Sequence, residues 1–124
     1  MAAQRLLVVE DELLVALDIE SILTGAGMVV VGPASTTHEA LELIASSTLD
    51  AALIDAKLGG EPVNNVAQAL SERGIPFAYV TGYGRESLPP DYPAPIVTKP
   101  FDADRLLAAA RRLLATAGEP DSAA

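Results

Sequence analysis

The chain has 124 residues, of which 50% are hydrophobic and 4% aromatic, and its formal net charge is −9. This length suits one domain with a core of aliphatic side chains, and the negative charge disfavours nucleic acids and anionic membranes as partners. With no cysteine, disulfides and thiolate chemistry are excluded, and no apolar run is long enough to span a membrane, so we expect a cytoplasmic protein.

The first strand is predicted at residues 6–9, an apolar run that ends on three consecutive acids, Glu10, Asp11 and Glu12. Because apolar residues then recur at helical spacing up to Ala26, the acids are expected in a strand-to-helix turn. Three adjacent carboxylates repel one another, and solvent, a helix N-terminus or a bound cation relieves that repulsion. The triplet by itself leaves a capping role and a cation site equally open.

A second strand is predicted at residues 28–33, where Gly32-Pro33 is expected to end it. Thr36 or Thr37 then begins a helix. The apolar side chains expected to face inward from this helix are Leu41, Ile44 and Ala45. The single histidine, His38, has no second histidine or cysteine nearby, so we assign it no role.

The central strand is predicted at residues 51–54, four apolar residues followed by the carboxylate of Asp55. Open α/β sheets place their ligand crevice at this carboxyl end of the strands, which makes Asp55 a candidate site residue. Taken alone, Asp55 is better explained as the start of the loop that contains Gly59-Gly60. Glu61-Pro62 is expected in the first turn of the next helix. The apolar stripe of that helix comprises Val66, Ala67 and Leu70.

Two further strands are predicted at residues 75–80 and 95–98, and they end on Thr81 and Lys99. Between them, the prolines of residues 83–95 break any long helix, so this segment is expected to be irregular or mobile. The last helix has Asp102 as its predicted N-cap. Its buried stripe is predicted to be Leu106, Leu107, Ala110, Leu113 and Leu114. We expect one domain, residues 1–117, and a tail, residues 118–124.

Alternating strands and helices predict a parallel sheet covered on both faces, with the carboxyl ends of all strands along one edge. The residues expected to converge there are Glu10, Asp11, Asp55, Thr81 and Lys99. Three carboxylates around one point favour a hard cation, and Mg²⁺ is the natural choice. A hydroxyl and an ammonium beside that metal suit a transferred phosphoryl group, for which Asp55 is the best-placed acceptor.

Four motifs of the chain match those of a known family in order and spacing. They are Val8-Val9-Glu10-Asp11-Glu12, Leu53-Ile54-Asp55, Thr81-Gly82 and Lys99-Pro100-Phe101. On these residues the chain resembles a response-regulator receiver domain over nearly all of its length. The resemblance implies an α/β, flavodoxin-like (βα)5 three-layer sandwich with a parallel five-stranded sheet of order 2-1-3-4-5.

The resemblance also implies a role for each residue at the edge of the sheet. Asp11 and Asp55 would bind Mg²⁺ directly, and Glu10 would act through water. Lys57 would contribute its backbone carbonyl to the same metal, and Asp55 would carry the phosphoryl group.

On the same basis, Thr81 and Lys99 would hold the phosphoryl oxygens, and the Lys99-Pro100 peptide bond would be cis. Receivers usually have an aromatic residue three positions before this lysine. Here that position is Ile96, so switching by rotation of an aromatic ring at this position is not expected.

Residues 76–83 resemble the Pro-Phe-x-Phe-Ala-Thr-Gly-Tyr motif of receivers associated with HWE and related histidine kinases. The match is inexact, because Tyr79 and Val80 replace Phe and Ala. In that subgroup Tyr83 is a candidate for switching or for tuning dephosphorylation, and the alternative is an exposed aromatic residue of a loop.

We therefore expect a stand-alone receiver of a two-component phosphorelay, since no DNA-binding or enzymatic segment follows the last helix. Its partners would be a histidine kinase or phosphotransfer protein and an unknown downstream protein, with no nucleic acid and no membrane. One alternative is an aspartyl-nucleophile phosphatase, but Lys57 stands where such enzymes carry a general-acid Asp. The other is a pseudo-receiver that binds its partner without phosphorylation. The oligomeric state stays open.

Overall fold

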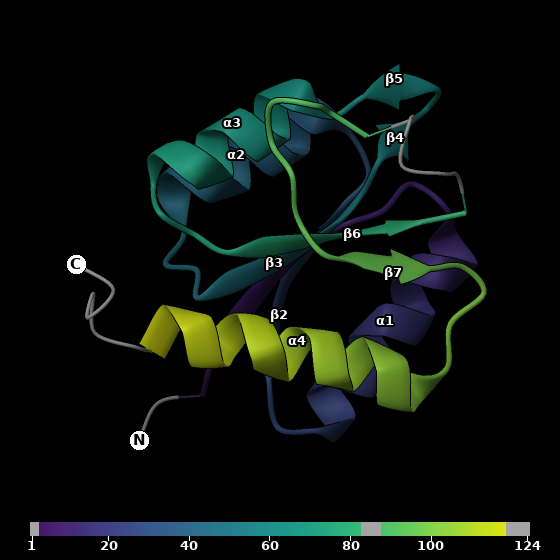
Figure 1. Cartoon of the computed structure of the whole chain (residues 1–124). Helices are drawn as coiled ribbons and strands as arrows, with labels where there is room; N and C mark the ends of the chain where they lie inside the picture. The colour runs from purple at the N-terminus through teal and green to yellow at the C-terminus, as the bar shows by residue number, and fades with distance from the viewer. Residues whose placement is uncertain (1–2, 83–87, 119–124) are drawn as a thin grey trace.

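The computed structural model describes residues 3–82 and 88–118. A parallel five-stranded sheet forms the centre of the molecule and has helices on both faces (Figure 1). In spatial order its strands are β2 (Val29–Ala34), β1 (Arg5–Val9), β3 (Ala51–Asp55), β6 (Phe77–Thr81) and β7 (Ile96–Thr98). The helices are α1 (Leu13–Gly25), α2 (Thr37–Ser46), α3 (Asn64–Glu72) and α4 (Ala103–Gly118). This is the expected flavodoxin-like strand order.

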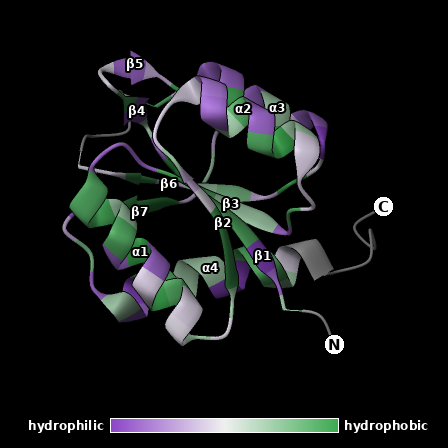
Figure 2. Ribbon diagram, turned by 180° about the vertical axis from the view of Figure 1, so that it is seen from behind, coloured by the Kyte–Doolittle hydropathy of each residue, from purple (hydrophilic) through white to green (hydrophobic). Residues whose placement is uncertain are grey.

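The two faces of the sheet carry separate hydrophobic clusters, because successive side chains of a strand point to opposite faces. Leu7 and Val9 of β1 pack with α2 and α3. Leu6 and Val8 pack with α1 and α4. The central strands are buried on both sides and therefore appear as continuous hydrophobic runs, as Figure 2 shows for the middle of the sheet.

Most of the predicted helix boundaries and faces are confirmed. The hydroxyl of Thr36 accepts a hydrogen bond from the Glu39 amide at the start of α2, and Asp102 caps α4 by accepting from the Arg105 amide. The predicted stripe of α3 is fully buried, and that of α4 is buried except for Leu107, which is half-buried. In α2, however, Ala45 is exposed, and the inward face uses Ala40 with Ile44 instead.

The second strand does not end at Gly32-Pro33 as predicted but continues to Ala34. Its pairing with β1 shifts register at this point and resumes where Val9 faces Ala34. Gly32 adopts a φ of +98°, and a Cβ there would lie 2.7 Å from the Ala34 nitrogen. Only glycine fits this close approach, so the dipeptide makes a bulge inside the strand rather than its end.

A short hairpin follows β3 where a loop and the start of a helix were predicted. It consists of β4 (Lys57–Leu58) and β5 (Glu61–Pro62), which pair antiparallel. Gly59 and Gly60 connect them with φ values of +57° and +83°, which suit a tight two-residue turn. Pro62 therefore belongs to a strand, and α3 begins at Asn64.

The described residues contain four helices rather than five. Residues 88–95, between β6 and β7, form no helix and run as an irregular strap, as the prolines predicted. Residues 83–87 of the segment expected to be irregular lie outside the described part of the chain, as does the tail from residue 119. Within the described residues, no helix has the length and apolar character needed to cross a membrane.

Candidate functional site

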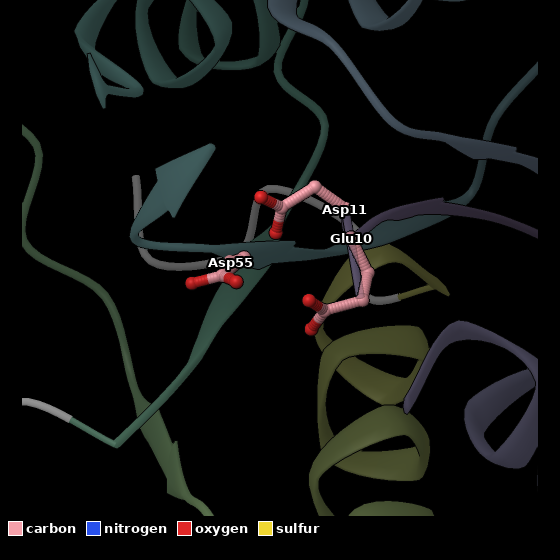
Figure 3. A group of neighbouring side chains, drawn as sticks. All are labelled: Glu10, Asp11 and Asp55. Atoms are coloured by element: carbon pink, nitrogen blue, oxygen red, sulfur yellow. The ribbon is translucent and has the colours of Figure 1, made fainter. Parts of the chain in front are cut away.

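Three carboxylates meet at the carboxyl edge of the sheet. Glu10 and Asp11 follow the last residue of β1, and Asp55 is the last residue of the neighbouring strand β3. One oxygen of each lies within 4.8 Å of the others (Figure 3). The predicted convergence of these residues is therefore present, and it follows from the parallel pairing of β1 with β3.

Glu10 is the most enclosed of the three, with 2% of its surface exposed. Its Oε2 accepts a hydrogen bond from the Glu12 amide, and its Oε1 lies 2.9 Å from the ammonium of Lys99. Burial raises the pKa of Glu10 to about 7, and the charge of Asp55 adds to the rise, while Lys99 and the Glu12 amide oppose it. A buried carboxylate beside other carboxylates is a group that a cation or its bound water would stabilise.

Lys99 supplies the positive charge of the site. Its Nζ lies 2.9 Å from Glu10 Oε1 and 3.2 Å from Asp55 Oδ2. Burial lowers the pKa of Lys99, but the carboxylates of Glu10 and Asp55 outweigh this effect and raise it to about 12. The ammonium of Lys99 is thus shared by two buried carboxylates and, at 3.5 Å, by the exposed carboxylate of Glu12, so it only partly balances the negative charge of the site.

Asp55 is 5% exposed, and its two oxygens have different partners. Oδ1 accepts a hydrogen bond from the Lys57 amide at 3.2 Å, and Oδ2 accepts one from Lys99. A carboxylate held in this way can act as a nucleophile.

Thr81 ends β6 and is fully buried. Its carbonyl accepts a hydrogen bond from the Lys99 amide, which ties the ends of β6 and β7 together. The peptide bond between Lys99 and Pro100 is cis, as the resemblance implied.

Asp11 is exposed, and its Oδ2 accepts a hydrogen bond from the Gly59 amide at 2.9 Å. The β4–β5 hairpin therefore holds this carboxylate. A depression of about 430 Å³ opens above the carboxylates. Among the residues that line it are Asp11, Asp55, Lys57, Gly82 and Lys99.

Sequence reasoning missed two contributors to this site. Gly59 could have been found from the Gly-Gly pair, which is a common two-residue hairpin turn. Glu12 was placed only in the acidic turn, but its Oε1 lies 3.5 Å from Lys99 Nζ, a pairing between residues 87 positions apart. Ile96, at the position where receivers usually carry the switching aromatic residue, pairs with Tyr79 in the sheet and is half-buried. The switch candidate Tyr83 lies outside the described residues.

No family model matches the chain. It is 31% identical over 107 residues to the phyllosphere-induced regulator PhyR of Methylorubrum extorquens, a match that covers 80% of this chain and 39% of PhyR. The chain thus spans well under half the length of the curated relative.

Two solved structures match nearly end to end. A CheY-like response regulator receiver domain protein of Methanospirillum hungatei superposes with a TM-score of 0.84 at 26% identity, covering 94% of this chain and 97% of the other. SdrG of Sphingomonas melonis superposes with a TM-score of 0.80 at 36% identity, covering 92% and 99%.

Proposed function

Because this chain belongs to the response-regulator receiver family, we propose that it accepts a phosphoryl group on Asp55 and signals by docking on another protein. The observation that carries the proposal is the position of Asp55 beside both a cluster of carboxylates and an ammonium 3.2 Å away. The phosphodonor would be a histidine kinase or phosphotransfer protein, and the protein would act in the cytoplasm. As in its relative PhyR, which is named a regulator, the output would be regulatory.

In the proposed step, an oxygen of the Asp55 carboxylate attacks the phosphorus of a phosphohistidine. The P–N bond breaks, its electron pair stays with the imidazole, and an acyl phosphate forms on Asp55. The ammonium of Lys99 and the hydroxyl of Thr81 would hold oxygens of the incoming group, because phosphoryl transfer depends mainly on positioning and charge neutralisation.

Mg²⁺ is the cofactor that the donor set fits. Carboxylates of Asp11 and Asp55, Glu10 through water and the carbonyl of Lys57 would hold it. When bound, Mg²⁺ would neutralise charge on the carboxylates and on the transferred phosphoryl oxygens. The excess of negative charge supports this assignment, since three carboxylates cluster here and the Lys99 ammonium contacts two of them.

The proposal is tested by the intact mass of the protein after incubation with acetyl phosphate. We expect one phosphoryl adduct that forms with Mg²⁺ and fails to form when the metal is chelated. If no adduct forms, a titration with beryllofluoride distinguishes rapid turnover, in which beryllofluoride still binds, from a pseudo-receiver, in which it does not.

The phosphodonor protein would dock on the first turns of α1, beside the site. Three leucines there are exposed although they are hydrophobic: Leu13 (69%), Leu14 (80%) and Leu17 (48%). These turns are green in Figure 2. A groove of about 500 Å³ beside them is lined by Leu14, Phe101 and Lys99, so the apolar surface is continuous with the site.

Replacing Leu14 with Asn is expected to slow phosphotransfer from a histidine phosphodonor protein by about tenfold, because an exposed apolar anchor is lost. Phosphorylation by acetyl phosphate should be unchanged, since that donor needs no docking surface. Val29→Asn, at a half-exposed position on edge strand β2, is the matched control. Equal slowing with both donors would assign the defect to the site itself, and no slowing with either would exclude this docking contact.

A further inference from the structure

Glu12 is the residue that precedes α1, a position from which polar side chains often cap the first turn of a helix. The side chain of Glu12 makes no capping hydrogen bond. Its Oε1 lies instead 3.5 Å from Nζ of Lys99, at the other end of the sequence. Helix capping therefore does not account for this carboxylate, whereas the candidate site does.

The carboxylate of Glu12 lies at the mouth of the site. Its side chain is 65% exposed, whereas those of Lys99 and Asp55 are 17% and 7% exposed. Glu12 lines both the depression above the carboxylates and the groove beside α1, so it lies where the two meet. A small molecule that approaches Lys99 from either side passes this carboxylate.

The main chain holds Glu12 in this place independently of its side chain. The Glu12 amide donates a hydrogen bond of 3.1 Å to Oε2 of Glu10. The Glu12 carbonyl accepts one of 2.9 Å from the Ala16 amide in the first turn of α1. A substitution that changes only the side-chain charge at this position therefore leaves both of these contacts in place.

The charge of Glu12 exceeds what the site balances. Lys99 already contacts the buried carboxylates of Glu10 and Asp55, at 2.9 and 3.2 Å. This ammonium and a divalent cation together match the charge of the three clustered carboxylates. The carboxylate of Glu12 comes in addition, so it repels anions at the entrance and competes with a phosphoryl oxygen for Lys99.

We propose that Glu12 is a specificity-determining residue that disfavours small phosphodonors with several negative charges relative to less charged ones. The inference rests on the proposed phosphoacceptor function. Repulsion by Glu12 slows the entry of a free dianion such as acetyl phosphate. Its ion pair with Lys99 also loosens before the ammonium holds the transferred group. Glu12 thereby limits the phosphorylation of Asp55 by free phosphate compounds.

The test compares wild type and Glu12→Gln in the rate of phosphoryl adduct formation, measured by intact mass at saturating Mg²⁺. With acetyl phosphate at low ionic strength, Glu12→Gln is expected to react about two- to fivefold faster, the range that one exposed ion pair supports. The difference should nearly vanish at about 1 M salt, where charges are screened within about 3 Å. With phosphoramidate, which carries less negative charge, the acceleration should be smaller.

Beryllofluoride, a stable substitute for the phosphoryl group, provides a measurement that involves no turnover. Its Kd in the presence of Mg²⁺ should fall in Glu12→Gln, because Lys99 is released to the bound anion. Asp18→Asn is the matched control, since it removes the same charge from an exposed position further along α1 and should change the rates far less. Thermal unfolding should be the same for all three proteins.

Equal rates for wild type and Glu12→Gln with acetyl phosphate at low ionic strength would overturn the role of Glu12. An acceleration that persists in high salt, or that Asp18→Asn reproduces, would overturn it as well. If the proteins form adducts and bind beryllofluoride equally well, the specificity role alone is lost. If no protein forms an adduct or binds beryllofluoride, the phosphoacceptor function fails and the role of Glu12 fails with it.

Discussion

Replacing Asp55 with Asn is expected to abolish the phosphoryl adduct from acetyl phosphate completely. The amide is a poor nucleophile, and the substitution also removes a charged oxygen from the proposed metal site. The fold should survive, because the side chains have nearly the same shape and one of several mutually repelling carboxylates is lost. Intact mass measures the adduct, and thermal unfolding checks the fold.

The matched control for this substitution is Asp11→Asn, which removes a neighbouring carboxylate of the same cluster but leaves Asp55 in place. It should weaken the dependence on Mg²⁺ and slow phosphorylation, yet an adduct should still accumulate at high Mg²⁺ concentration. An adduct on the Asp55 variant, located by peptide mapping, would mean that another carboxylate is the acceptor.

Replacing Glu10 with Gln is expected to change how stability depends on pH. Burial raises the pKa of Glu10 in the folded protein to about 7 from an ordinary value of 4.5. A raised pKa means that the folded state binds the proton more tightly. The contribution of Glu10 to stability is therefore complete below about pH 4.5 and is lost as the pH rises through about 7.

The loss amounts to at most about 3 to 4 kcal/mol, since the pKa of Glu10 is raised from 4.5 to about 7 and each pKa unit corresponds to about 1.4 kcal/mol. Urea unfolding without metal between pH 5 and pH 8 should show this decline in the wild type and not in Glu10→Gln. Mg²⁺ should restore stability to the wild type at pH 8 more than at pH 5, because it needs the ionised carboxylate. Glu72→Gln, on an exposed residue of α3, is the control, and parallel curves for wild type and Glu10→Gln would refute the assignment.

The convergence of the site was predictable because it depends on topology more than on side-chain detail. A parallel sheet brings the ends of its strands to one edge, so Glu10, Asp55 and Lys99 could be placed together from the hydrophobic runs that precede them. The helices were predictable for a similar reason, since the spacing of apolar residues defines which face is buried.

The features that escaped prediction depend on contacts between distant parts of the chain. The bulge in β2 needs the close approach of Gly32 to the Val8 carbonyl, 3.0 Å from where a Cβ would lie. The Gly59 amide donates a hydrogen bond to Asp11 only because the β4–β5 hairpin brings the two residues together. The sequence alone favoured a helix that starts near Pro62 instead of this hairpin. The partner of the Tyr79 hydroxyl is likewise a backbone carbonyl, which no residue type identifies.

Prolines limit both open edges of the sheet. On one edge, β2 contains Pro33 and the register shift beside it. On the other, β7 is three residues long and lies between Pro95 and Pro100. An added strand would find too few aligned N–H and C=O groups on either side, which protects a domain rich in aliphatic residues from edge-to-edge aggregation. Any self-association of this domain would therefore use helix surfaces and loops rather than a sheet continued across two molecules.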